Sequence, residues 1–413
     1  MIKIGIRQNL IYPTAFAFSS ALRDIGDIIM KKKIFMKENI LKKKSIYFEN
    51  SFLSLIMFIS EFISGLIFYK YHINFLKRRK IETESTIMGI KLVKRRNVKI
   101  SIPDSNLVIY IYIFLISLLD YSDFFFKINI FPNYYNTSNI SISSTLYIRL
   151  RVVLTFFSSF FSYFLLKIPI HKHQKCSLIL LGFCFLYFLI TEFSFSFLKH
   201  NSIDPKFTFI IVMTILSQLL FSFIDIIEKY LLEYNFVNPF QMLMIEGIFG
   251  AILVIISFFI WTNPIYEIKQ LYCIYKDKLL IIFILILFLI IYFVLSGIKN
   301  IYRVVTNKIY NPTTKNLFDI LMDPLLLVIY FFIEGDLQNM EHNHDRLIIL
   351  ICNLIVSLLI IFCCCVYNEL FVLFCCGLEY NTHREISKRA DYSRIKELNP
   401  VDDNDSDDGE YDK

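Results

Sequence analysis

The sequence of 413 residues has little glycine, few charges and no paired cysteine motif. Its 11 glycines leave little room for a glycine-rich loop that cradles nucleotide phosphates, so an ATP-driven pump is not expected. Charged residues are 19% of the chain, too few to cover a protein folded around one aqueous core. The nine cysteines contain no CxxC spacing, so no zinc site is expected, and no motif calls for another metal or a cofactor.

Apolar residues fill the chain instead: they make up 56% of it, and the mean hydropathy is +0.55. A helix crosses roughly 30 Å of hydrocarbon with about 20 apolar residues, and about eight stretches reach that length. They are 48–69, 107–126, 142–166, 177–198, 207–227, 242–261, 279–295 and 347–366. Two weaker stretches, 10–30 and 316–333, contain ionisable residues. The runs lack the alternation of a β-barrel, so they predict an all-α polytopic membrane protein with about ten transmembrane helices.

The loops between these stretches differ in charge. Lysine and arginine gather in 70–99, 167–175 and 299–315, so the positive-inside rule predicts that this side is cytosolic. These loops account for the formal net charge of +7, and a nucleic-acid partner is therefore not expected. The opposite side receives two glycosylation sequons, which begin at Asn136 and Asn139. Only the lysine-rich stretch 31–44 falls on the side that this rule disfavours.

Four regions follow from this pattern. Residues 1–47 form an N-terminal segment that is either a weak first span or a leader. Residues 48–206 and 207–367 form the first and second halves of the helical bundle, and 368–413 form a cytosolic tail with an acidic end. With no large ectodomain in view, we expect an intracellular organelle membrane of vacuolar, Golgi-like or plastid-like type. A homodimer is left open.

Two short stretches in the two halves match each other. Ser143 and Ser144 precede Arg149, and Thr313 and Thr314 precede Asp319 at the same spacing. The stretches open spans that are five helices apart, so they enter the membrane in opposite orientations, as in an inverted repeat. This places Arg149 and Asp319 near the middle of the protein, where each charge can offset the desolvation of the other. Asp319 is expected to pair with Arg149 or Lys315, and a role as a proton carrier is left open.

Several short motifs follow one another between about residue 48 and residue 386, in an order and spacing that can be compared with known families. The central ones are Ile215-Leu216-Ser217-Gln218, Glu228-Lys229-Tyr230-Leu231, Tyr234-Asn235, Pro239 and Glu246-Gly247-Ile248-Phe249-Gly250. The others are Phe58-Ile59-Ser60-Glu61-Phe62, 117–120, 143–149, 312–319, Tyr367-Asn368-Glu369 and 376–382. Together they resemble the drug/metabolite transporter superfamily, specifically the F-type branch of solute carrier family 35. The resemblance implies ten helices in two inverted five-helix halves and a carrier that alternates its access.

The chain departs from this family pattern at three places. Lys315 stands where the pattern usually has arginine, and Met322 and Asp323 replace a more typical small or basic pair. The first helix of the family is hardly recognisable in residues 10–30. Nucleotide sugars, which other branches carry, are therefore not assigned to this chain.

Ionisable residues within the spans are the candidate functional residues, because a charge in hydrocarbon costs at least about 2.5 kcal/mol. The predicted substrate-binding set is Arg149, Lys315, Asp319, Ser144 and Thr314. The carboxylates predicted either to couple transport or to tie helices together are Glu61, Asp120, Glu192 and Glu246. The alternative for Arg149 is a snorkelling or packing role, and Arg151 is expected to act as an anchor. Glu228 and Lys229 are expected to pin the turn before Pro239.

These residues predict a secondary-active transporter for a small anionic or zwitterionic metabolite, working by alternating access in a lipid bilayer. The alternative is a non-transporting membrane receptor or scaffold that signals through the acidic tail. An integral membrane enzyme, acting through His200 or His342, is a third hypothesis, and enzymatic activity is not expected.

Overall fold

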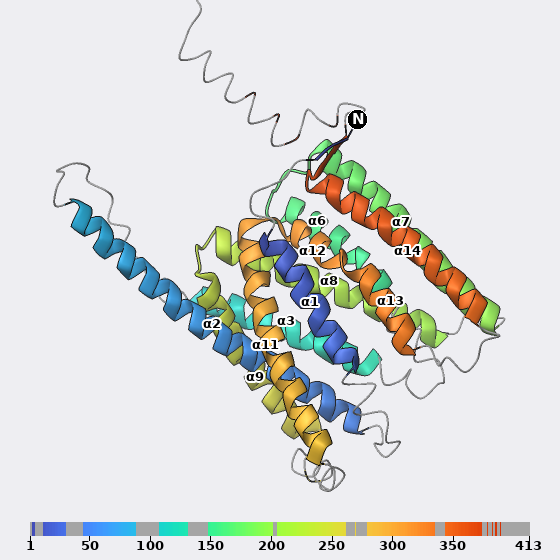
Figure 1. Cartoon of the computed structure of the whole chain (residues 1–413), viewed down its shortest axis with the longest axis horizontal. Coiled ribbons are helices and arrows are strands. Elements are labelled where there is room, and N and C mark those ends of the chain that lie inside the picture. Colours follow the sequence, from blue (N-terminus) through green and yellow to red (C-terminus); the bar gives the residue numbers. More distant parts are fainter. Residues whose placement is uncertain are drawn as a thin grey trace, which may run out of the picture.

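The computed structural model describes residues 2–4, 11–29, 44–87, 107–130, 148–200, 205–261, 279–334 and 343–373, together with residues 269, 378, 382, 385 and 389. Within these residues the fold is all-α apart from one short pair of strands, which confirms the predicted fold class at that level (Figure 1).

In the described part of the chain, each predicted span lies on a helix, except that the span predicted at 316–333 is divided between two helices. The helices of the described part are α1 (Ile11–Ile29), α2 (Lys44–Ile87), α3 (Leu107–Ile130), α6 (Val152–Phe164), α7 (Lys172–His200), α8 (Pro205–Glu233), α9 (Pro239–Trp261), α11 (Leu279–Ile309), α12 (Pro312–Ile320), α13 (Asp323–Glu334) and α14 (Asn343–Tyr367). Prolines begin α8, α9 and α12, where the missing N–H costs no hydrogen bond. Asn238 caps α9, because its side-chain oxygen accepts a hydrogen bond from the Phe240 N–H at 2.9 Å.

Five of the described helical segments are long and apolar enough to cross a membrane, so the chain has the character of a multi-pass membrane protein. They are Ser51–Asn74, Lys172–Thr191, Thr208–Glu233, Pro239–Ile260 and Ile282–Ile309. The helices extend further than the apolar runs: α2 continues to Ile87 and α11 to Ile309. Residues 299–309 are therefore helix and not loop, because lysine and arginine continue a helix as well as apolar residues do.

Helices α2 and α9 cross closely at two glycines. A Cβ atom at Gly65 of α2 would lie 2.7 Å from the backbone nitrogen of Met244 and 3.0 Å from the oxygen of Phe240. A Cβ atom at Gly247 of α9 would meet the backbone of Phe62 and of Phe58 in the same way. Gly65, late in α2, meets the start of α9, whereas Phe58 and Phe62, earlier in α2, meet Gly247 further along α9. The two helices are therefore antiparallel. Small residues allow this backbone approach, as in helix pairs within membranes.

The second part of the bundle contains α6, α7, α12, α13 and α14. Helices α7 and α14 lie side by side (Figure 1) and share a core that includes Leu181, Phe188 and Ile360. The span predicted at 316–333 is broken in two by a turn at Leu321 and Met322, and Pro324 follows at the second position of α13. Asp319 and Asp323 flank this break.

A short antiparallel strand pair joins the N-terminal segment to the residues that follow α14. Strand β1 (Ile2–Ile4) pairs with β2 (Phe371–Leu373), and Ile2 lies opposite Leu373. The pair ties the start of the chain to the segment that follows α14.

Candidate functional site

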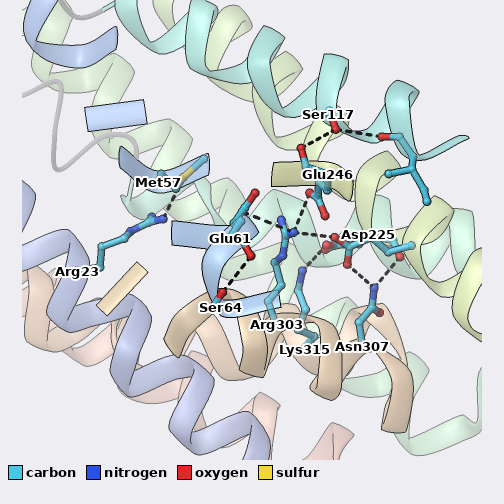
Figure 2. Close-up of polar contacts among 12 residues, drawn as sticks. Arg23, Met57, Glu61, Ser64, Ser117, Asp225, Glu246, Arg303, Asn307 and Lys315 are labelled. Atoms are coloured by element: carbon cyan, nitrogen blue, oxygen red, sulfur yellow. Dashed lines mark hydrogen bonds and ion pairs between the residues drawn. The ribbon is translucent and has the colours of Figure 1, made fainter. Parts of the chain in front are cut away.

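The guanidinium of Arg303 lies among carboxylates from four other helices. Arg303 is on α11 and is 7% exposed. Its Nη2 atom is 2.8 Å from Glu246 Oε1 on α9 and 3.9 Å from Glu61 Oε1 on α2 (Figure 2). The same atom is 3.2 Å from Glu228 Oε1 on α8. Asp120 of α3 is also close enough to interact electrostatically with this guanidinium. We call these five residues the Arg303 centre.

A second cation lies beside this centre. Lys315 of α12 donates a hydrogen bond to Asp225 of α8, and both side chains are buried (Figure 2). Asn307 of α11 donates from one amide group to Glu228 Oε2 at 3.0 Å and to the backbone oxygen of Asp225 at 2.9 Å. Asp225 and Glu228 are three residues apart and therefore share one face of α8. Through Asp225 and Glu228 on α8, the polar contacts thus connect Lys315 of α12 to the Arg303 centre.

One face of α11 supplies the polar side of this interior. Ser296, Asn300, Arg303 and Asn307 follow one another at intervals of four, three and four residues, the spacing of one helical face. All four side chains are buried. The opposite positions of α11 are apolar and include exposed residues such as Ile291 and Val294, as expected of a surface against lipid.

Several buried polar atoms at this interior have no hydrogen-bond partner within the described residues. They are both carboxylate oxygens of Glu61, Oε2 of Glu246, Oδ2 of Asp225, Nδ2 of Asn300 and the hydroxyl of Ser296. Leaving a buried polar group unsatisfied costs about 1–3 kcal/mol. Groups of this kind are satisfied by water or by a polar solute, so their concentration along α2, α9 and α11 makes this interior the candidate site.

Three of these carboxylates meet one condition for a metal site. Oxygen atoms of Glu61, Asp120 and Glu246 lie within 4.8 Å of one another. Arg303 Nη2, however, is 2.8 Å from Glu246, so a permanent positive charge already stands beside this group. Arg303 thereby takes up part of the coordination that a divalent ion would need, and the arrangement suits a cation with fewer ligands, such as an amine.

A second ionic network lies at the break between α12 and α13. Arg151, which precedes α6, donates a hydrogen bond to Asp319 and another to Asp323 Oδ1 at 2.9 Å. Asp24 of α1 and Lys299 of α11 also interact electrostatically with Asp319. We call Arg151, Asp319 and Asp323 the Arg151 centre. It joins α6 to α12 and α13.

The two networks differ in charge. Around the Arg151 centre, the cations Arg151, Lys299 and Arg23 face as many carboxylates: Asp24, Asp319 and Asp323. Around Arg303 and Lys315 the carboxylates outnumber the cations, since Glu61, Asp120, Asp225, Glu228 and Glu246 all lie there. The Arg303 region is therefore the one that needs additional positive charge.

The predicted residues are placed unequally. Glu61, Asp120 and Glu246 come together at the Arg303 centre, and Lys315 lies next to it. Thr314 is buried on α12 beside Lys315. Ser144 lies outside the described residues, and Glu192 is on α7 with its side chain outside the described part.

The partner of Asp319 is a correction to the sequence analysis. The arginine recorded as donating to Asp319 is Arg151, and the contact recorded for Arg149 is a different one. Arg149 is half-buried, and its charge acts on Tyr187 of α7. The cause is local: Arg149 and Arg151 are two positions apart on a backbone that stays helical at Arg151, so they lie on different faces, and Arg151 is on the face toward α12 and α13.

Sequence reasoning missed Arg303, Asn307 and Asp225, and it gave Glu228 only a role in a turn. The sequence predicts a basic loop at Arg303 and Asn307 because the apolar run ends near 295, but the helix continues to Ile309. The signal that could have found them is the polar face of α11 described above.

Comparisons with known proteins leave the family open. No family model matches the sequence, and no curated protein matches it. One solved structure, described only as a crystal structure of a protein, aligns with 87% of this chain and 96% of its own, at 10% sequence identity and a TM-score of 0.46. A TM-score of this size carries no argument about fold or function.

Proposed function

We propose that this protein is a secondary-active carrier of the drug/metabolite transporter type, which moves a small solute across an intracellular membrane by alternating access. The observation that carries the proposal is the Arg303 centre. Glu61 and Asp120 come from the first half of the chain, and Glu228, Glu246 and Arg303 come from the second. Ionisable groups buried within apolar helices are retained at solute and ion pathways, because elsewhere their cost is not offset.

The α2–α9 crossing supports an arrangement of two inverted halves. Gly65 faces Phe240 and Met244, while Gly247 faces Phe58 and Phe62. If Gly65 is matched with Gly247, Phe62 with Met244 and Phe58 with Phe240, exchanging the two helices gives the same set of contacts. Two antiparallel helices with this property are related by a twofold axis across their length, which is the relation that an inverted repeat requires.

The packing of the other helices agrees with such an exchange when α1, α2, α3, α6 and α7 correspond to α8, α9, α11, α12–α13 and α14. Helix α1 packs on α11 as α8 packs on α3, and α1 packs on α12 as α8 packs on α6. Helix α3 contacts α9 as α11 contacts α2. The contacting pairs α7–α14 and α6–α12 each consist of two corresponding helices, so the exchange leaves these contacts unchanged. In carriers of this kind, one half rocks against the other around a site at their interface.

The charge distribution selects between the two substrate classes expected from the sequence. An excess of carboxylates at the Arg303 centre favours an ammonium group, while Arg303 and Lys315 can receive an acidic group of the same solute. A zwitterionic metabolite satisfies both, whereas a purely anionic one would add to the negative excess. The proposal is therefore a zwitterionic substrate, and it retains an organelle membrane and a cytosolic C-terminus. The receptor or scaffold alternative depends on residues 391–413, which lie outside the described residues.

A panel of radiolabelled zwitterionic, anionic and cationic metabolites tests the proposal in proteoliposomes that contain purified protein. Wild-type protein should exchange at least one zwitterionic solute, and Arg303→Gln should abolish exchange while the protein still elutes as a single species. Lys175→Gln, which alters an exposed cation at the start of α7, is the matched control and should keep full exchange. A wild-type protein that moves none of these solutes would refute the carrier.

A further inference from the structure

Glu61 differs from the other carboxylates of the Arg303 centre in its contacts. It is 0% exposed, and neither of its carboxylate oxygens accepts a hydrogen bond from any described residue. The nearest cationic atom recorded for it is Arg303 Nη2, at 3.9 Å. Figure 2 shows its side chain on α2, aimed at Arg303. Glu61 is therefore buried and turned into the centre, but it takes no direct part in the hydrogen bonding there.

The two cations of this region are already engaged by other groups. Arg303 is within 2.8 Å of Glu246 and 3.2 Å of Glu228, and Lys315 is hydrogen-bonded to Asp225. Coulomb attraction falls with distance, so Arg303 holds Glu61 least strongly of the three glutamates.

The charged groups that face Glu61 from the neighbouring helices are mostly acidic. They are Glu246 of α9, Asp120 of α3, Glu228 of α8 and the single cation Arg303 of α11. On the α1 side, Arg23 contacts the sulfur of Met57, one turn before Glu61. Like charges at this separation cannot all be ionised in a buried site, so one carboxyl must be neutralised when no cationic ligand is present.

We propose that Glu61 is the proton-binding site through which this carrier is coupled to a proton gradient, an inference that rests on the proposed function. One proton from water forms an O–H bond with a Glu61 oxygen, and the side chain becomes neutral. On the other side of the membrane the O–H bond breaks, the proton returns to water, and the negative charge left on Glu61 draws Arg303 away from Glu246. No other reactant is consumed.

A proton fits this position better than a metal ion does. Divalent cations need several oxygen ligands around an open centre, whereas Arg303 stands beside Glu246 within the same group. A proton needs only one lone pair, and Glu61 offers two oxygens without hydrogen bonds from the described part of the chain.

The position of Glu61 also links its charge to the packing of the two halves. The neighbouring Ser60 donates a hydrogen bond to the Phe293 backbone oxygen of α11, and Gly65, one turn further along α2, lies at the crossing with α9. A shift of Arg303 toward Glu61 would therefore act on the α2–α9–α11 contacts, where the proposed halves meet.

The test begins with protonation itself, measured by infrared difference spectroscopy of purified protein in liposomes as the pH is lowered. This measurement needs no solute. Wild type should develop the band of a buried protonated carboxyl, and Glu61→Gln should lack it. Glu233→Gln, which changes a carboxylate that is 56% exposed at the end of α8, should keep the band.

A second variant keeps the proposal testable if Glu61→Gln fails to fold. Glu61→Asp keeps an ionisable group on a shorter side chain, so its band should shift in frequency and not vanish. The proposal is overturned if wild type shows no titrating buried carboxyl, or if the band is unchanged in Glu61→Asp or persists in folded Glu61→Gln.

Transport then separates this inference from the carrier proposal. With the membrane potential clamped, one proton exchanged per zwitterion should give about tenfold accumulation per pH unit, since each factor of ten is about 1.4 kcal/mol. Glu61→Gln should exchange solute without accumulating it. Solute exchange that responds only to a sodium gradient, or not to pH, leaves the carrier standing and removes the proton site. Titration of Glu61 without movement of any solute removes the carrier and leaves a proton-binding site.

Discussion

The crossing of α2 and α9 makes a quantitative prediction about glycine. An alanine at Gly65 would place its methyl group 2.7 Å from the Met244 backbone nitrogen and 3.0 Å from the Phe240 oxygen. These are backbone atoms, so neither can move aside as a flexible side chain can. Overpacking of this kind costs about 1–3 kcal/mol, and alanine recovers roughly 0.5–1 kcal/mol as the better helix former. We expect Gly65→Ala to lose about 1 kcal/mol of stability, near the middle of the range that these two terms leave.

The proposed exchange of halves adds a second expectation to this variant. Gly247 meets Phe62 and Phe58 as Gly65 meets Met244 and Phe240, so Gly247→Ala should be destabilised by a similar amount. Gly26 of α1 has nothing within 4 Å of its Cβ position, and Gly26→Ala should be neutral or stabilising. It is the matched control, because it makes the same chemical change inside a helix.

Thermal stability of the detergent-solubilised variants measures these differences. Each variant is heated in steps, and the fraction that still elutes as a single species gives a midpoint. Gly65→Ala and Gly247→Ala should have lower midpoints than wild type, and Gly26→Ala should not. Equal midpoints for all three variants, or a loss at only one of the two crossing glycines, would refute the symmetric close approach.

Two further predictions concern the buried ion pairs. Arg151→Ala leaves Asp319 and Asp323 without their arginine, and breaking a buried pair costs about 3–5 kcal/mol, so its melting midpoint should fall well below that of Arg149→Ala. The same midpoint for both variants would contradict the assignment to Arg151. Lys315→Met should be destabilised for the same reason, and adding Asp225→Leu should restore much of the loss in a double-mutant cycle. Additive losses would show that the two side chains do not depend on each other.

Hydropathy alone located the helices because each apolar run must bury its backbone hydrogen bonds within a helix. Hydropathy predicts the ends of these helices less well. Basic residues at the ends of α2 and α11 look like loops in composition, but they continue the helix, and Arg303 was placed outside the bundle for this reason.

The candidate site was predictable only in part. Glu61, Asp120 and Glu246 were found because carboxylates within apolar runs are conspicuous, and the structure brings these three together. The arginine that pairs with Asp319 was not identified, because the sequence does not show which face of this helix, the one with Arg149 or the one with Arg151, packs against α12. Pairings of this kind depend on packing between distant segments, which no local pattern records.

Water access to the polar face of α11 tests the central claim most directly. In a cysteine-free background, Asn300→Cys places one thiol on the face that carries Arg303, and a charged, membrane-impermeant thiol reagent is then added to one side of the membrane or the other. Alternating access predicts labelling from both sides, with solute shifting the balance between them. A thiol that reacts from neither side, or from one side under all conditions, would contradict the carrier.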